Sequence, residues 1–233
     1  MLNLQNKIFV GVTSTSARRP KDHWKEQLQE IKSLGIKEIA LFPTTLLPNE
    51  RKELYSQLET SGVIEVKLLH LRSDFSQEEL EYFFNKYKTR YFNCHPSDLD
   101  NFYQKFAQYR KYILLELNYK YNLFPLPIEP KQMGGFCIDL AHFKTAQVRK
   151  TPDYDYVTER KHNTKFLANH LGGYSKSKIH DLHFVTNENQ FDYLLDLPEY
   201  IFGEVIALEL ENSIRKQLEF KEYVVRLLAN KDI

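Results

Sequence analysis

The feature that most constrains the fold of this chain is a regular alternation of short apolar runs with helix-like segments. Short apolar runs of this kind are typical of buried β-strands. We expect strands at residues 7–13, 38–43, 65–71, 90–96, 112–119, 134–143, 178–185 and 205–211. Apolar residues at helical spacing follow most of these runs, and capping residues such as Ser76, with Glu79 three residues later, mark helix starts.

This alternation predicts a single α/β domain over residues 1–233, folded as a (β/α)8 barrel, also called a TIM barrel. Eight units in 233 residues give about 29 residues each, close to the size of a barrel of about 250 residues. The competing fold, a doubly wound open sheet, would place a glycine-rich phosphate-binding turn after an early strand. The sequence contains no such turn and no P-loop. Before the seventh strand we expect a polar loop over 144–156 and then a helix reaching about Ala168.

Composition narrows the class of protein. Apolar residues make up 42% and charged residues 27% of the chain, as in ordinary globular proteins, and the net charge of +1 gives no general attraction to nucleic acid or anionic lipid. Cys94 and Cys137 lie in apolar runs, which predicts buried free thiols in a reducing compartment. No segment has the roughly 20 apolar residues of a bilayer span, and the run at 8–12 is too short for a signal-peptide core. We therefore expect a cytoplasmic protein without a membrane partner, and a homo-oligomer remains one option.

Potential metal ligands occur at the ends of six consecutive predicted strands. The active site of such a barrel lies at the carboxyl ends of its strands, so these side chains are expected to converge. They are His70, His95, Glu116, Asp139 with His142, His183, and Glu209 or Glu211. The last two are two residues apart and point to the same side of a strand, and Glu209 is preferred because it lies within the apolar run. The other histidines, at positions 23, 162, 170 and 180, are interpreted as surface or structural residues.

Each of these residues also has a purely structural interpretation. Glu116 alone fits a buried ion pair, Asp139 fits a loop cap, and His183 fits a satisfied core histidine, because buried charges also occur in structural networks. A His-Pro turn such as that at His95 is common after a strand, and local hydrogen bonds suffice to explain His70. The prediction of a metal site therefore depends on their joint placement at one end of the barrel.

Carboxylates with a single imidazole favour hard divalent cations. One ion of Mn²⁺, Mg²⁺ or Co²⁺ suits Glu116, Asp139, His183 and Glu209, and Zn²⁺ also fits. Such an ion polarises a carbonyl while Glu116 and Glu209 move a proton beside it, which predicts isomerisation or epimerisation of a sugar or sugar phosphate. If His70, His95 or His142 complete a second site, two zinc ions would instead favour phosphodiester hydrolysis. A third alternative is a barrel that has lost catalysis and only binds a ligand.

Four short segments resemble the xylose isomerase-like superfamily of TIM barrels, which includes sugar isomerases and epimerases and the endonuclease IV family (AP endonuclease family 2). They are Leu115–Asn118 (LELN), Ile138–His142 (IDLAH), Asp181–Phe184 (DLHF) and Ala207–Glu211 (ALELE). In the epimerase branch, the resemblance implies one metal on Glu116, Asp139, His183 and Glu209. It also implies that the two glutamates act as acid and base and that the residue matching His142 contacts the substrate.

The endonuclease IV branch has additional ligands. It adds two histidines, which His70 and His95 resemble, and an Asp-x-His pair after strand seven for a third zinc. With strand seven at 178–185, the following residues 186–190 (TNENQ) contain no such pair. This absence and the near-zero net charge favour a sugar substrate over nucleic acid. Arg18 and Trp24, with the segments 119–133 and 144–156, are expected to form the rim that selects the substrate. Basic loops around the mouth, which a nucleic-acid enzyme would need, have candidates only in Arg18, Arg19, Lys144, Arg149 and Lys150, and a solvated rim is the preferred interpretation of these residues.

Overall fold

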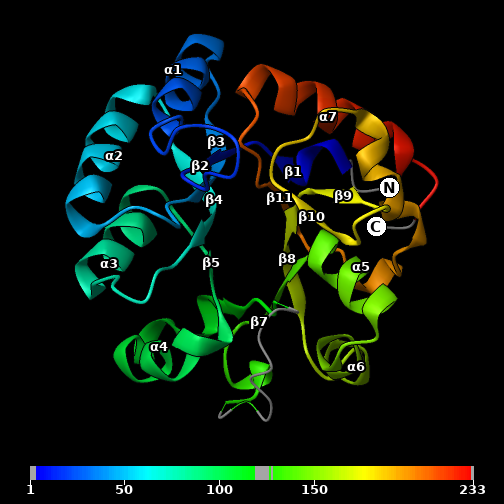
Figure 1. Cartoon of the computed structure of the whole chain (residues 1–233). Helices are drawn as coiled ribbons and strands as arrows, with labels where there is room; N and C mark the ends of the chain where they lie inside the picture. Colours follow the sequence, from blue (N-terminus) through cyan, green and yellow to red (C-terminus); the bar gives the residue numbers. More distant parts are fainter. Residues whose placement is uncertain (1–3, 119–125, 127, 232–233) are drawn as a thin grey trace.

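A ring of parallel strands with helices outside it forms the fold of this chain (Figure 1). The computed structural model describes residues 4–118, 126 and 128–231. Neighbouring strands follow the order β1-β11-β8-β7-β6-β5-β4-β3-β2, and all of their pairings are parallel. The strands are β1 (Ile8–Phe9), β2 (Gly11–Thr13), β3 (Glu38–Phe42), β4 (Glu65–His70), β5 (Tyr91–Cys94), β6 (Ile113–Leu115), β7 (Gly135–Asp139), β8 (Phe166–Leu171) and β11 (Val205–Leu208). This arrangement confirms the predicted (β/α)8 barrel.

The ring is closed by a first strand that is divided in two. β1 pairs with β11, β2 pairs with β3, and only Val10 separates the two short strands. At the division the main chains come close together, because a Cβ atom on Gly11 would lie 2.0 Å from the carbonyl oxygen of Leu208. Only glycine fits at this position.

Two buried glutamines bridge the gap where β2 and β11 do not pair. The Gln217 side chain accepts a hydrogen bond from the Gly11 amide (2.8 Å) and donates one to the Gly11 carbonyl (2.9 Å). Gln27 accepts from the Thr13 amide (2.9 Å) and donates to the carbonyls of residues 210 and 212 (2.9 Å each). These side-chain amides satisfy main-chain groups that a strand ladder would otherwise pair. We call these contacts the glutamine seam.

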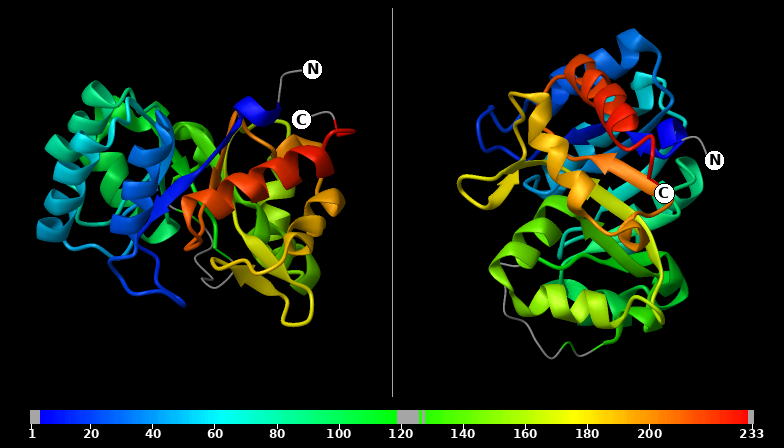
Figure 2. Two further views of the ribbon diagram at one scale, coloured as in Figure 1. Left: turned by 90° about the horizontal axis from the view of Figure 1, so that it is seen from above. Right: turned by 90° about the vertical axis from the view of Figure 1, so that its right-hand side faces the viewer.

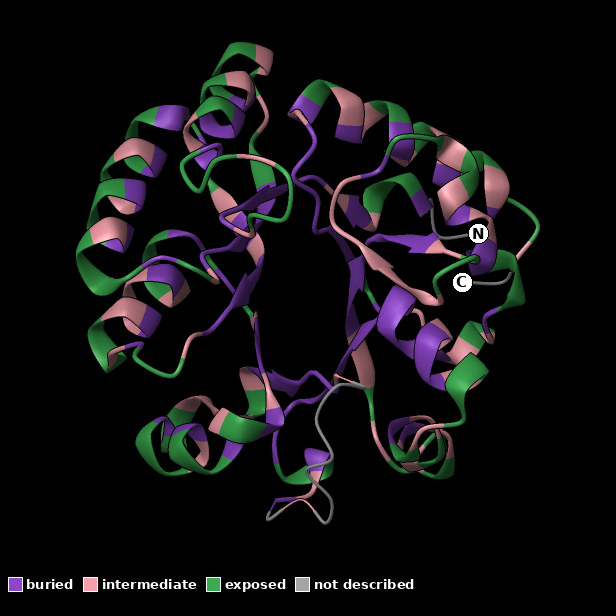
Figure 3. Ribbon diagram, viewed as in Figure 1, coloured by how far each residue is buried: buried purple, intermediate pink, exposed green. Residues whose placement is uncertain are grey.

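The helices are α1 (Trp24–Leu34), α2 (Pro48–Ser61), α3 (Gln77–Lys86), α4 (Leu99–Lys105), α5 (Leu140–Arg149), α6 (Pro152–Glu159) and α7 (Ile214–Leu227). Several are amphipathic, with buried faces toward the barrel and exposed faces outside (Figure 3). The predicted cap of α3 is confirmed, since Ser76 accepts from the Glu79 amide and Glu79 accepts from the Ser76 amide. Among the described residues, no helix combines the length and the apolar character needed to cross a membrane.

Apolar side chains fill both the inside of the barrel and the layer between strands and helices. The inner group consists of Ala40, Phe42, Leu68, Leu114, Cys137, Ala168, Val205 and Ala207. The larger outer group packs the helices onto the strands. Cys94 and Cys137 are buried free thiols, as predicted.

The prediction for residues 144–185 was wrong. The seventh barrel strand is β8 (Phe166–Leu171), and the expected polar loop is largely occupied by α5 and α6. The segment predicted as strand seven lies instead in an antiparallel hairpin, β9 (Gly173–Ser175) and β10 (His180–Leu182), with contacts between β10 and α5. Figure 2 shows that this hairpin projects from the same end of the barrel as the loop between β2 and α1.

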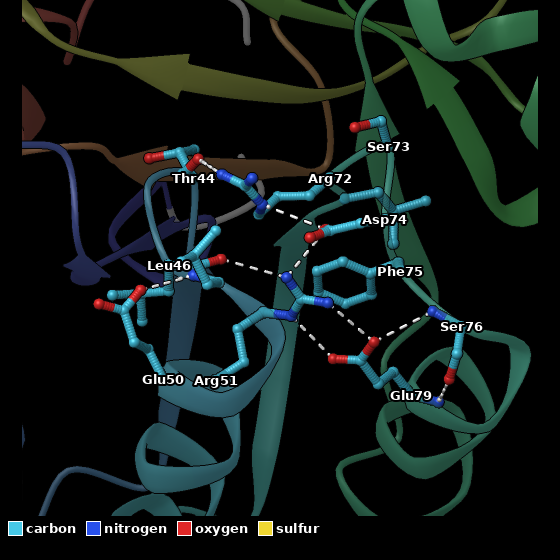
Figure 4. Close-up of polar contacts among 12 residues, drawn as sticks. Thr44, Leu46, Glu50, Arg51, Arg72, Ser73, Asp74, Phe75, Ser76 and Glu79 are labelled. Carbon is cyan, nitrogen blue, oxygen red and sulfur yellow. Dashed lines mark hydrogen bonds and ion pairs between the residues drawn. The ribbon is translucent and has the colours of Figure 1, made fainter.

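A buried arginine joins the outer helices to the loop after β4 (Figure 4). Arg51 of α2 donates to both carboxylate oxygens of Glu79 (2.8 and 3.0 Å), to Asp74 (2.9 Å) and to the carbonyl of Leu46 (3.1 Å). Burial opposes its charge, but these acceptors raise the pKa of Arg51 above its ordinary value. The loop that continues from β4 is thereby fixed at the carboxyl end of the barrel.

Candidate metal centre

A polar layer lies above the apolar interior, at the carboxyl ends of the strands. Side chains two residues apart on a strand point to the same side, so a charged residue two positions after an inward apolar residue also faces inward. The chain repeats this step on four neighbouring strands, at Leu114 and Glu116, Cys137 and Asp139, Ala168 and His170, and Ala207 and Glu209. On each of these strands an apolar side chain in the barrel interior is thus followed, toward the carboxyl end, by an ionisable side chain.

Glu116 lies at the centre of this layer and is only 2% exposed. One of its oxygens, Oε2, lies 3.2 Å from His70 Nε2 and 3.7 Å from His95 Nε2. The other, Oε1, lies 3.3 Å from His170 Nδ1. The side-chain amide of Asn93 donates to Oε2 (2.7 Å), which fixes the orientation of the carboxylate.

Glu116 is therefore shared by two groups of potential ligands. One group contains His70, His95 and Glu116, and the other contains Glu116, Asp139 and His170. Within each group the potential ligand atoms all lie within 4.8 Å of one another. Glu209 extends the second group, because its Oε2 lies 3.1 Å from His170 Nδ1. Five side chains, each from the end of a different barrel strand, thus surround the shared carboxylate of Glu116.

His170 is a site residue that the sequence analysis missed. It is completely buried on β8, between the carboxylates of Glu116 and Glu209. Its interpretation as a surface or structural residue was wrong, because the helix predicted to reach about Ala168 made the run that contains His183 strand seven. The sequence did contain a signal for this role: in the run FLANHL (166–171) a histidine is the penultimate residue, and two glycines follow the run, as at the end of a strand that leads into a site.

A third group lies beside the second and includes the hairpin. His142 Nε2 lies 3.5 Å from Asp181 Oδ1, and His183 Nε2 lies 3.4 Å from Asp181 Oδ2. His142 Nδ1 in turn lies 3.7 Å from Asp139 Oδ2, which connects this group to the barrel. Asp181 and His183 form an Asp-x-His pair that follows the seventh strand as the structure defines it. The prediction that this pair is absent was wrong, because it depended on the wrong strand.

The other predicted positions have different outcomes. His183 belongs to the hairpin group and does not occupy the position on strand seven, which His170 takes. Glu211 faces the loop between β2 and α1, where its carboxylate accepts three main-chain hydrogen bonds, whereas Glu209 faces His170. Trp24 is 2% exposed and belongs to the outer core, so its assignment to the rim was wrong. Arg18 is exposed, and the expected rim segment 119–133 lies largely outside the described residues.

The buried charges shift one another's pKa values strongly. Burial opposes ionisation of Glu116, but His170 and His95 hold its pKa well below the usual range. Burial also opposes protonation of His170, yet Cys137 and Glu116 raise its pKa well above the ordinary value. Asp181 raises the pKa of His183 to about 10 against the effect of burial. Without cations, the imidazoles thus act as counter-charges for the carboxylates.

The side chains fit divalent cations. Neither ring nitrogen of the buried His170 makes a regular hydrogen bond to a described residue. His70 and His183 hold their Nδ1 atoms against main-chain carbonyl oxygens, of Leu71 (2.8 Å) and Glu209 (3.3 Å), so each directs Nε2 toward a carboxylate of the site. Metal-binding histidines are oriented in this way by an acceptor at the second nitrogen. Imidazole mixed with carboxylate suits Zn²⁺ and other first-row divalent ions.

Comparison with known proteins identifies the fold and not a family. No protein-family model matches the chain, and no curated protein sequence is similar to it. A solved structure of a putative uncharacterized protein from Parabacteroides distasonis has a TM-score of 0.50 and 16% identity, over 94% of this chain and 98% of that chain. A D-tagatose 3-epimerase-like protein has a TM-score of 0.49 and 16% identity, over 95% of this chain and 97% of that chain. At these identities the similarity concerns the barrel alone.

Proposed function

We propose that this protein is a metal-dependent hydrolase of phosphate esters. The proposed substrate is a phosphodiester next to an abasic site in nucleic acid, as the resemblance to the endonuclease IV family implies. The observation that carries the proposal is the position of Glu116, which is shared by two groups of potential ligands. A carboxylate shared in this way suits a centre with more than one cation, and paired cations favour phosphodiester hydrolysis.

Two further observations support this proposal over a single-metal isomerase. In such an isomerase His70 and His95 would have no part in the chemistry, yet both direct Nε2 at Glu116 Oε2. The Asp-x-His pair expected for a third zinc is present as Asp181 and His183, close to His142. The feature whose predicted absence counted against abasic-site cleavage is therefore present in this chain.

The proposed roles of the side chains follow from their positions. His70, His95 and Glu116 would hold one cation, and Glu116, Asp139, His170 and Glu209 a second. His142, Asp181 and His183 would hold a third. Cations bound there would polarise a phosphoryl oxygen and supply a hydroxide nucleophile at neutral pH. Asn93 keeps the Glu116 carboxylate in the orientation that serves both groups.

The second candidate is a metal-dependent sugar isomerase or epimerase. It is favoured by the two glutamates, because Glu116 and Glu209 approach His170 from different strands, at 3.3 and 3.1 Å. One of them would remove a proton beside a carbonyl and the other would return it. This reaction would introduce solvent deuterium into a sugar or sugar phosphate.

The test combines metal analysis with two activity assays. We expect the purified protein to contain more than one divalent cation per chain and to cut a duplex that carries an abasic site. Glu116→Gln should lose most of the metal and reduce cleavage by about 10³-fold or more, since the loss affects two cations at once. Glu222→Gln, a change on the exposed side of α7, serves as the matched control.

Three outcomes would contradict the proposal. One cation per chain, with solvent deuterium entering a sugar and no cleavage of the duplex, would establish the isomerase instead. No stoichiometric metal in either the wild type or Glu116→Gln would leave a barrel that only binds a ligand. Full metal content in Glu116→Gln would show that the shared carboxylate is not a ligand.

A further inference from the structure

Glu211 is a buried carboxylate that the proposed chemistry does not use. It is 0% exposed and lies two residues after Glu209. Its oxygens accept hydrogen bonds from three consecutive main-chain amides, those of Ala17 (2.6 Å), Arg18 (2.8 Å) and Arg19 (3.0 Å). Successive amides that converge on one anion form a nest, which stabilises a negative charge without a cation.

The segment that carries Glu211 is held firmly in place. Its own amide donates to the carbonyl of His183 (2.7 Å), and the carbonyls on either side of it accept from Gln27 and Gln217 of the glutamine seam. The next residue, Asn212, exchanges two hydrogen bonds with the main chain of Val185 (2.8 and 2.9 Å). Glu211 therefore offers the loop between β2 and α1 a rigid anchoring point.

The loop presents Arg18 next to the third group of ligands. The Arg18 guanidinium carbon lies 5.7 Å from the centre of the Phe184 ring, and Phe184 directly follows His183. The side chain of Arg19 is paired with Glu26, whereas no carboxylate among the described residues lies within ion-pair distance of Arg18. Glu211 is bound by main-chain amides, including that of Arg18, and not by the Arg18 guanidinium. The Arg18 side chain therefore does not form an ion pair with Glu211.

We infer that Glu211 is a positioning residue that holds Arg18 at the mouth of the barrel, where the guanidinium binds a phosphate group of the substrate. A guanidinium suits this task, because it donates two parallel hydrogen bonds to phosphate oxygens. The inference rests on the proposed phosphoester substrate and assigns a substrate contact that the metal ligands do not supply. Glu211 acts on the substrate only through the loop.

The experiment is a double-mutant cycle on the metal-loaded protein. The variants are Arg18→Ala, Glu211→Gln and the pair together, with Glu222→Gln as the control. Inorganic phosphate is the probe, and its affinity is measured by calorimetry without turnover. We expect each single change to weaken phosphate binding by about tenfold and the pair to be no weaker than Arg18→Ala alone, since coupled residues are not additive.

Two further measurements separate positioning from a general structural effect. Hydrogen exchange of the peptide spanning residues 14–22 should be more than about tenfold faster in Glu211→Gln and unchanged in Arg18→Ala, because only the first change removes the negative charge and replaces one of the two acceptor oxygens by an NH2 donor. For phosphodiester cleavage, both changes should raise KM and leave kcat within about twofold, as expected for a lost binding contact. A merely structural role of Glu211 would lower kcat and metal content as well.

The results also distinguish this inference from the proposed function. Additive losses, phosphate affinity that does not depend on Arg18, or no phosphate binding at all would overturn the inference, even if the wild type cuts an abasic duplex. Amides that stay protected in Glu211→Gln would overturn it too. If no variant cuts a phosphodiester but the phosphate and exchange results hold, the hydrolase proposal fails while the positioning of Arg18 stands.

Discussion

At the scale of single residues, the centre depends on how imidazoles and carboxylates share buried space. His170, His142 and His183 each lie within 3.5 Å of a carboxylate oxygen. In the absence of cations these contacts favour the protonated imidazole, and they outweigh burial, which opposes its charge. These contacts orient the imidazoles, but they also favour a proton on each ring. A cation that binds an imidazole would therefore have to displace that proton.

This competition predicts that metal affinity rises with pH. The pKa values of His170 and His142 lie above the ordinary value, and that of His183 is raised to about 10, so the metal-free protein binds protons on these rings more tightly than free imidazoles do. A cation displaces them, and each proton displaced strengthens binding by up to about tenfold per pH unit. Titration against a competing chelator at pH 6, 7 and 8 measures the effect. The prediction fails if the dissociation constant is the same at all three values.

At the scale of elements, the buried Arg51 holds α2, α3 and the loop after β4 together. It lies over the Phe75 ring, 4.5 Å from its centre, and pairs with Glu79 and Asp74. In the same loop, Arg72 donates to the carbonyl of Thr44. These contacts link the outer helices to the strand end that carries His70.

We expect Glu79→Gln to lose stability in a pH-dependent way. Burial opposes ionisation of Glu79, but Arg51 and the Ser76 amide keep its pKa below the usual value. A lowered pKa in the folded state contributes stability above the unfolded value of about 4.3, and this contribution is lost as the pH falls below it. Urea unfolding of wild type and Glu79→Gln should therefore differ by about 1–3 kcal/mol at pH 7, the range for a hydrogen-bonded charge.

The difference should shrink as the pH falls from 5 to 3, because the unfolded chain takes up a proton at residue 79 near its ordinary pKa of about 4.3, whereas the folded chain takes it up only at lower pH. Glu222→Gln should show no such change, because residue 222 is exposed on α7. A difference that stays constant down to pH 3 would mean that the charge of Glu79 does not hold Arg51.

At the scale of the whole molecule, the glutamine seam closes the barrel where strand pairing stops. Gln217→Met preserves most of the side-chain volume but leaves the buried amide and carbonyl of Gly11 without partners. Since each unpaired buried group costs about 1–3 kcal/mol, we expect a loss of about 2–4 kcal/mol in urea unfolding. Gln29→Met, on the exposed side of α1, should change stability by less than about 0.5 kcal/mol. Equal effects of the two changes would show that the seam does not stabilise the barrel.

The sequence predicted much of this architecture, because apolar runs and helix caps are local signals. The strand ends at His70, Glu116, Asp139 and Glu209 were placed correctly, since each follows an apolar run that enters the barrel. The seventh strand was placed wrongly, because the chain has two strand-like runs in this region, FLANHL (166–171) and KIHDLHFV (178–185). Local periodicity cannot tell which of two such runs completes a ring, as this is decided by burial against neighbouring strands.

Glu211 and the glutamine seam were beyond prediction for a related reason. The amides that bind Glu211 lie 192–194 residues away in the chain, and Gly11 lies 206 residues from Gln217. These partners are main-chain groups, which leave no mark in the sequence. Trp24 was assigned to the rim from its residue type alone, whereas its burial is set by the packing of α1 on the barrel.

The hairpin β9–β10 places one part of the centre outside the barrel strands. Asp181 and His183 lie between β8 and the next helical segment, whereas His70, Glu116 and Asp139 are built into or directly after barrel strands. A change in the length of this one loop would therefore alter the third group without altering the barrel. Under the proposed function, the capacity for a third cation would thus be modular, separable by protein engineering from the other two groups.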